Sequence, residues 1–256
     1  MRVIPVPCLK DNYAYLLVGA GSDCVVVDAS EAAPVRGALE REGLHAKAIW
    51  STHHHWDHVG GNEELGKELG IEVVGHKSDK GRLPGLSHEV DTGDTVKAAG
   101  LSARCIHIPG HTLGAVAYFL DDGGQRAVFT GDTLFASGCG RLFEGTPAQM
   151  HASLASLLEL PGDTRVWCGH EYTESNLRFA AHCEPGNADV KVARDRAAAL
   201  RADGKPTVGT TLDEERRVNP FLRVGSKELR KSLDIATDAD DVTAFAAVRA
   251  AKDGFK

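Results

Sequence analysis

Four side chains that can bind a metal ion lie within six residues of one another: His53, His55, Asp57 and His58. They follow a short run, residues 46–51, that is typical of a β-strand. Alternate residues of an extended segment point the same way, so we expect His53 and His55 to converge on one ion. Asp57 and His58 lie beyond a predicted turn and could reach a second ion. Imidazole and carboxylate are ligands that suit zinc, iron or manganese. The segment therefore predicts a fold that holds a loop rigidly at the end of a strand.

Three further ligand candidates each lie beside a glycine at the end of a predicted strand. They are His111 in Pro-Gly-His-Thr, Asp132 in Thr-Gly-Asp-Thr and His170 in Cys-Gly-His-Glu. Taken singly, each is more typical of a satisfied structural histidine or of an aspartate in a turn. The histidine-rich segment alone is also compatible with a solvated loop. Strand-end sites repeated in this order instead predict a metal centre assembled from separate loops.

The first two thirds of the chain alternate short β-rich runs with loops and a few helices. The clearest helix begins at Thr146 and Pro147, where a capping residue precedes a proline. Beyond residue 172, charged and alanine-rich stretches predict helices, with a capping box at Thr211 and Glu214, and no further strand is expected. We therefore expect two domains, residues 1–172 and residues 173–256.

Charge and cysteine usage exclude several classes of function. Lys and Arg number 29 against 36 for Asp and Glu, a net charge of −7, which gives no general attraction to nucleic acid or anionic lipid. No apolar run approaches the roughly 20 residues that span a bilayer. The N-terminal residues do not resemble a signal peptide, and six scattered cysteines predict free thiols in a reducing compartment. The sequence thus indicates a cytoplasmic protein with no nucleic-acid or membrane partner.

The motifs together resemble a known family. H-x-H-x-D-H, followed by G-H-T, G-D-T-L-F and G-H-E-Y-T, is similar to the metallo-β-lactamase superfamily and, within it, to glyoxalase II. Residues 138–146 resemble the loop after the bridging aspartate in bacterial glyoxalase II, and residues 248–256 resemble that family's C-terminus. The resemblance covers the whole chain. It implies an α/β fold, the αββα sandwich of two mixed sheets, with a C-terminal helical domain that binds substrate.

The resemblance also implies a ligand set. It assigns to a first ion His53, His55 and His111, and to a second ion Asp57, His58 and His170. Asp132 is assigned to both ions. Asp57, His58 and Asp132 thereby take catalytic roles. The expected cofactor is two divalent metal ions, zinc first, with iron and manganese as alternatives. A hydroxide bridging the ions would attack the thioester of an S-(2-hydroxyacyl)glutathione, with S-D-lactoylglutathione as the implied substrate. The expected oligomeric state is a monomer.

Substrate contacts are carried over in the same way. Arg249 and Lys252 share a helix face at i and i+3, and the resemblance places them on the glycine carboxylate of glutathione. Without it, they are more typical of cations that suit the negative C-terminal end of the last helix. Arg141, Phe143 and Tyr172 match other positions of the substrate groove. Animal members resemble K-x-Y where this chain has Arg141-Leu-Phe143, so one tyrosine hydroxyl contact is missing.

Two other functions share some of these features. A persulfide dioxygenase uses similar ligands around one iron, but its relatives resemble G-R-T-D-F where this chain has Gly140-Arg-Leu-Phe-Glu144. A metal-dependent binding module without activity is the alternative outside enzymes, although every ligand position is intact. Release of free thiol from a glutathione thioester would separate enzyme from binding module.

Overall fold

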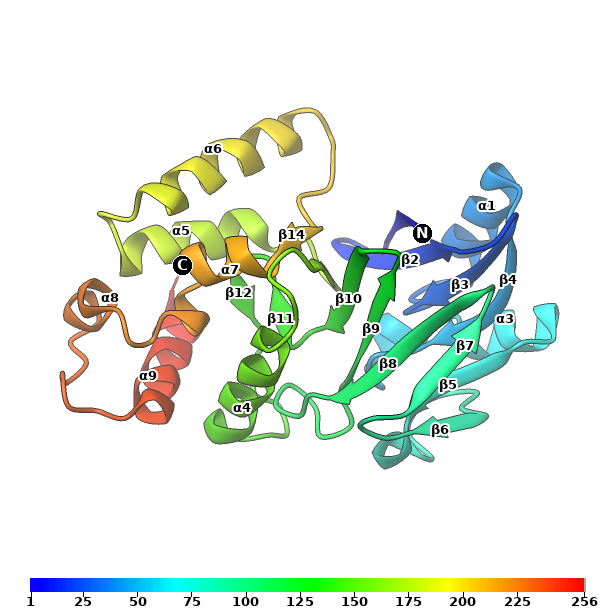
Figure 1. Ribbon diagram of the computed structural model, residues 1–256, viewed down its shortest axis with the longest axis horizontal. Helices are drawn as coiled ribbons and strands as arrows, with labels where there is room; N and C mark the ends of the chain where they lie inside the picture. The colour runs from blue at the N-terminus through cyan, green and yellow to red at the C-terminus, as the bar shows by residue number, and fades with distance from the viewer. Residues whose placement is uncertain (256) are drawn as a thin grey trace.

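The computed structural model describes residues 1–255; Lys256, the last residue of the C-terminal stretch that resembles glyoxalase II, lies outside this range. Two six-stranded mixed sheets pack face to face (Figure 1). The first sheet has the order β1-β2-β3-β4-β5-β6, antiparallel from β1 to β3 and parallel from β3 to β6. Its strands span Arg2–Cys8, Asn12–Val18, Asp23–Val27, His45–Trp50, Glu72–His76 and His88–Val90.

The second sheet has the order β14-β13-β10-β9-β8-β7, in which only the β10–β13 pair is parallel. In chain order, from β7 to β10 and then β13 and β14, its strands span Thr95–Ala98, Leu101–His107, Val116–Asp122, Gln125–Gly131, Arg165–Cys168 and Thr210–Thr211. A separate small hairpin pairs β11 (Leu134–Phe135) with β12 (Gly138–Cys139). This hairpin lies between β10 and the helix that follows it.

Large aromatic side chains fill the space between the sheets. Trp50 from the first sheet and Tyr118 from the second stack with ring centroids 5.4 Å apart, and Tyr15 packs edge-on against Phe129. Helices α1 and α3 cover the outer face of the first sheet, and α4 packs on the second (Figure 1). Helices α1 to α4, which include the short helix α2, span Ala32–Glu42, Trp56–Val59, Asn62–Leu69 and Pro147–Leu158. The predicted αββα sandwich is confirmed.

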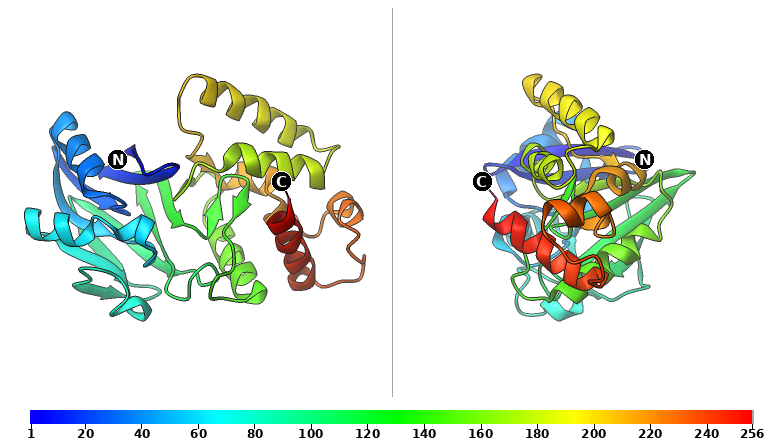
Figure 2. Two further views of the ribbon diagram at one scale, coloured as in Figure 1. Left: turned by 180° about the vertical axis from the view of Figure 1, so that it is seen from behind. Right: turned by 90° about the vertical axis from the view of Figure 1, so that its left-hand side faces the viewer.

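The rest of the chain is largely helical and gathers at one end of the molecule, beyond the second sheet (Figures 1 and 2). Helices α5 to α9 span Thr173–Cys183, Ala188–Ala202, Leu212–Val218, Lys227–Ser232 and Asp241–Gly254, and short 3₁₀ turns span Lys77–Asp79 and Pro220–Leu222. Phe245 and Val248 of α9 share one apolar cluster with Leu154 and Leu157 of α4. The sandwich and the helices are therefore joined through a continuous core, and the domain boundary at residue 172 stays a prediction.

Two helix starts form as their sequences predict. The Thr146 side chain accepts a hydrogen bond from the backbone N–H of Gln149, whose side chain accepts one from the Thr146 N–H. Thr211 and Glu214 form the same reciprocal box at the start of α7. Each box satisfies N–H groups that the first helical turn leaves without a partner.

The structure differs from the sequence-based expectations in two places and contains one strand that was not predicted. Residues after 172 do contain a strand, because β14 pairs with the edge of β13 over two residues, too few to leave a β pattern in the sequence. Strand β1 was missed because it carries Pro5 and Pro7, which an edge strand tolerates. The segment at Asp57 is a short helix, α2, instead of a turn.

Two expectations about the chemistry of the chain can be compared with the described residues. Within residues 1–255, none of the helices combines the length and the apolar character needed to cross a bilayer. The cysteines, all of them in this range, are buried and unpaired, as expected for free thiols.

Candidate metal centre and substrate cleft

Each predicted metal ligand lies just beyond the end of a strand. The segment 53–58 follows β4, His111 follows β8, Asp132 follows β10 and His170 follows β13. Strand β4 belongs to the first sheet and the others to the second. Because the two sheets face each other, these loops meet at one edge of the sandwich, where a rigid scaffold fixes the direction of each side chain.

The structure brings all of the predicted ligands together. Their donor atoms form overlapping groups in which every atom lies within 4.8 Å of every other, namely His53, His55 and His111; His53, His58 and Asp132; and Asp57, His58 and His170. Asp132 occupies the middle of this arrangement. Its Oδ2 lies 3.4 Å from His111 Nε2 and 3.2 Å from His170 Nε2, and its Oδ1 lies 3.3 Å from His58 Nε2.

The histidines around this carboxylate differ in their affinity for protons. Burial lowers the pKa of His53 well below its usual value and lowers that of His55 to about 4, with neighbouring imidazoles adding to the effect. Burial acts in the same direction on His58 and His170, but the Asp132 carboxylate outweighs it and raises the pKa of both. One side of the cluster therefore offers neutral imidazoles, and the other side attracts positive charge.

Unsatisfied polar atoms show that the residues fit metal ions. Among the described residues, the buried atoms His53 Nε2, His58 Nε2 and Asp132 Oδ1 have no hydrogen-bond partner. Buried polar atoms are rarely left in this state unless a water, an ion or a ligand completes the site. Imidazole nitrogen and carboxylate oxygen are the donors that divalent transition metals prefer in hydrolytic sites.

Further carboxylates orient two of the imidazoles. Asp28, the first residue after β3, lies 3.0 Å through Oδ2 from His58 Nδ1 and accepts hydrogen bonds from the Thr52 N–H and hydroxyl. Asp11 Oδ1 lies 2.9 Å from His170 Nδ1. With Nδ1 engaged, each ring presents Nε2 to the cluster, the arrangement that supports metal-binding histidines.

A backbone group plays the same role for His111, whose Nδ1 donates to the Arg141 carbonyl at 2.8 Å. None of these three supporting groups was predicted from the sequence. Asp28 could have been found, because it follows an apolar strand as the proposed ligands do. Asp11 lies in an ordinary turn, and the position of the Arg141 carbonyl cannot be inferred from the residue type.

A cleft of about 850 Å³ opens over this cluster. Its walls combine candidate ligands with every predicted substrate-contact residue: His55, Asp57, His111, Asp132 and His170 with Arg141, Phe143, Tyr172, Arg249 and Lys252. The Tyr172 ring stacks on His170 with centroids 4.7 Å apart, and burial raises the pKa of its hydroxyl to about 12. Phe143, with 64% of its surface exposed, packs edge-on against His55 and His111. Aromatic rings thus form the wall beside the cluster.

The two cations of α9 have different surroundings. Arg249 is buried, and its guanidinium donates to the Cys139 carbonyl at 2.8 Å and to Asp253 at 2.9 Å. The Lys252 ammonium donates to the Ser175 carbonyl and hydroxyl, each at 3.2 Å. Burial, together with the charge of Arg249, lowers the pKa of Lys252 to about 8.

The chain is similar to known proteins over its whole length. Residues 10–170 match the family model of the metallo-beta-lactamase superfamily, and residues 171–255 match that of the hydroxyacylglutathione hydrolase C-terminus. A hydroxyacylglutathione hydrolase of Synechococcus sp. (strain JA-2-3B'a(2-13)) is 47% identical over all of both chains. One of Gloeobacter violaceus is 49% identical, again over all of both chains.

Solved structures share the fold. The crystal structure of TTHA1623 in a di-iron-bound form has a TM-score of 0.61 and 29% identity, and the match covers 87% of this chain and 100% of that one. The sandwich, the clustered histidines and aspartates, and two family models that together span nearly the whole chain lead to one conclusion. The chain belongs to the hydroxyacylglutathione hydrolase family of the metallo-β-lactamase superfamily.

Proposed function

We propose that this protein is a thioesterase that hydrolyses S-(2-hydroxyacyl)glutathione, with S-D-lactoylglutathione as the first substrate to test. The observation that carries the proposal is the single cleft over the metal-ligand cluster, because it also contains the cationic and aromatic side chains suited to a glutathione thioester. The relatives' names agree with this substrate class.

In this proposal, seven side chains hold two divalent cations. A first cation is assigned to His53, His55 and His111, a second to Asp57, His58 and His170, and both to Asp132. Cations bound there would lower the pKa of water from 15.7 to roughly 7, providing a nucleophile at neutral pH, and would polarise the thioester carbonyl. Zinc is the expected metal, with iron and manganese as alternatives, since all three accept this donor set.

The protein's own groups hold the ligands and shape the reaction space. Asp28 and Asp11 keep the Nδ1 atoms of His58 and His170 engaged, so that Nε2 of each ring stays directed at the cluster. Tyr172 covers one face of the His170 ring, and Phe143 packs edge-on against His111. The thiolate that leaves needs little further help, because thiols have pKa values near 8.5.

Recognition of glutathione is assigned to the end of the cleft beside α9. Arg141 and Arg249 both approach the Asp253 carboxylate, with N···O distances of 3.6 and 2.9 Å. A carboxylate is therefore already attracted to the place where we expect the glycine carboxylate of glutathione. Lys252 adds a third cation on the same cleft wall. Charge-assisted hydrogen bonds of this kind contribute roughly 1.5–3 kcal/mol each.

Two further expectations, a monomer and a cytoplasmic location, accompany the proposal. Unpaired buried cysteines are typical of proteins in reducing compartments, which supports the location. Light scattering of the purified protein and fractionation of the cells that make it will test these two expectations independently of activity.

The proposed activity is tested by adding purified, metal-loaded protein to S-D-lactoylglutathione and measuring free thiol. We expect thiol release that depends on the protein and stops when a chelator removes the metal. Binding of the thioester without thiol release would indicate a binding module. Oxygen consumption with a glutathione persulfide and one bound iron, in place of thioester hydrolysis, would indicate the dioxygenase.

A further inference from the structure

The hairpin β11–β12 is too short to hold its own shape. It pairs only Leu134 with Cys139 and Phe135 with Gly138, and an isolated hairpin is marginally stable even when longer. Its turn contains Ser137, a buried residue with φ of +59°, in the left-handed region that residues other than glycine rarely adopt. Groups outside the hairpin must therefore fix this conformation.

Side chains from the helical part of the chain provide those groups. Asn176 of α5 donates to the Ala136 carbonyl, Asn219 donates to the Gly138 carbonyl, and Arg249 of α9 donates to the Cys139 carbonyl, at 3.1, 3.0 and 2.8 Å. The Ser137 N–H donates to Glu215 Oε2 of α7 at 2.8 Å. Glu215 is the only acceptor among these four side chains, and its partner is Ser137, the residue with the left-handed conformation.

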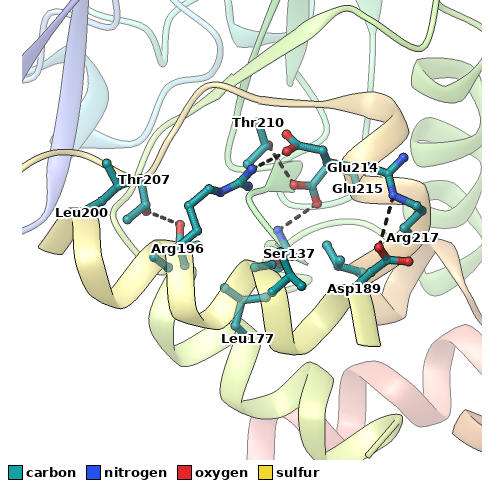
Figure 3. Close-up of a pocket in the computed structure, with 15 residues that line it drawn as sticks. Ser137, Leu177, Asp189, Arg196, Leu200, Thr207, Thr210, Glu214, Glu215 and Arg217 are labelled. Carbon is teal, nitrogen blue, oxygen red and sulfur yellow. Dashed lines mark hydrogen bonds and ion pairs between the residues drawn. The ribbon is translucent and has the colours of Figure 1, made fainter. Parts of the chain in front are cut away.

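Glu215 is fully buried, and both of its carboxylate oxygens are used. Oε2 also accepts from the Asn219 side-chain amide at 2.9 Å, and Oε1 accepts from the Thr210 hydroxyl at 2.8 Å. Figure 3 shows Glu215 directed toward Ser137 and Thr210 at one side of a small pocket between the helices. Burial raises the pKa of this carboxyl to about 7 against the opposing effect of these hydrogen bonds. Through these hydrogen bonds, the Glu215 side chain links α7, β14 and the hairpin.

The hairpin in turn contacts the metal-ligand cluster. Gly140 follows β12, and a Cβ at this position would clash with the Asp132 carbonyl oxygen and lie 3.0 Å from His111 Nδ1. The next residue, Arg141, provides the carbonyl that accepts from His111 Nδ1. Within β11, the Phe135 ring packs edge-on against His170 at 6.0 Å between centroids. A shift of the hairpin would therefore move groups that orient His111 and His170.

We propose that Glu215 is a positioning residue for the metal centre, acting through the Ser137 N–H and the hairpin on the orientation of His111. The inference rests on the proposed metal site and extends it, because it assigns to the helical part of the chain a role in metal binding as well as in substrate binding. Loss of the carboxylate would free the strained turn, and the Arg141 carbonyl would no longer be held against His111.

The test measures Co²⁺ affinity of the metal-free, full-length protein, with the visible absorption of bound Co²⁺ as the readout of ligand geometry. Glu215→Ala is expected to weaken binding about tenfold, the lower end of the range for partners of metal ligands, and to alter the spectrum. Glu215→Gln retains an acceptor for the Ser137 N–H and should bind within about twofold of wild type. Glu215→Asp, one methylene shorter, provides an intermediate case if the alanine variant does not fold.

Glu184 provides a matched control. It is also buried in the helical part, where it accepts from Arg223 and Ser226, and within residues 1–255 none of its side-chain hydrogen bonds reaches the hairpin. Glu184→Ala should lower the melting temperature of the metal-free protein without changing the Co²⁺ spectrum. Equal Co²⁺ affinity in wild type, Glu215→Ala and Glu215→Asp would overturn the positioning role, as would an equal loss in Glu184→Ala. Absence of Co²⁺ binding by the wild type would instead overturn the metal site itself.

Discussion

The two walls of the cleft are built differently. The wall from the sandwich includes side chains just beyond strand ends that carboxylates or carbonyls support, as Asp11 supports the buried His170. The wall from the helical part includes longer cationic side chains carried by α9, such as Lys252, whose ammonium donates to the Ser175 carbonyl. The first arrangement suits ions, which demand fixed ligands; the second suits a flexible substrate. We therefore expect substitutions at Asp132 and at Lys252 to separate the chemistry from the recognition.

The largest effect is expected on the sandwich wall, at Asp132. Asp132→Ala removes a carboxylate that approaches ligands on both sides of the cluster, so both metal ions should be lost in elemental analysis. The activity should fall by more than about 100-fold, which is the largest loss expected when a group that supports a metal ligand is removed. Asp163→Ala, at an exposed residue paired with Arg126, is the control. Retention of one full metal equivalent would show that Asp132 does not bridge.

A smaller and more selective effect is expected at Asp28. Asp28→Asn keeps the acceptor for the Thr52 N–H but removes the charge beside His58. One metal site should weaken by about 10- to 100-fold while the other is retained. Competition with a chelator of known affinity will resolve the two sites. Equal weakening of both would mean that Asp28 stabilises the loop as a whole.

On the helical wall, the expected change is in substrate affinity. Lys252→Ala should raise KM for the glutathione thioester about tenfold, with little change in kcat or metal content, because the contact persists from ground state to transition state. A thioester that lacks the glycine carboxylate should be cleaved equally by variant and wild type. Equal losses on both substrates would assign Lys252 a structural role. Arg249→Ala is less informative, since Arg249 also holds the Cys139 carbonyl.

The smallest effect is expected at Asp253, which in the proposed binding mode would compete with substrate for two arginines. Asp253→Asn should lower KM about twofold, as expected for weak, partly exposed ion pairs, and the gain should shrink at high salt. Initial rates at two ionic strengths will check this. An increase in KM would mean that Asp253 positions Arg249 instead of competing for it.

The same contrast explains what could be predicted from the sequence. The candidates His111, Asp132 and His170 were recognisable because each lies beside glycine at the end of a local β pattern. The helix start at Thr146 was recognisable from a capping residue before a proline, and the one at Thr211 from a capping box. Local patterns of this kind carry their own physical explanation.

Contacts between distant segments could not be predicted. Glu215 lies in the first turn of α7, where an acidic residue is ordinary on an exposed helix; only the packing of β14 and the hairpin buries it. Strand β14 exists through its pairing with β13 alone. The tertiary structure thus supplied the supporting groups, while the sequence indicated the chemistry.

The most direct test of a two-metal thioesterase is a titration of the metal-free protein with Zn²⁺ while thiol release from S-D-lactoylglutathione is measured. The proposed site predicts that activity rises with added metal and reaches its plateau at two equivalents per chain. A plateau at one equivalent, or thiol release that does not depend on the metal, would contradict it.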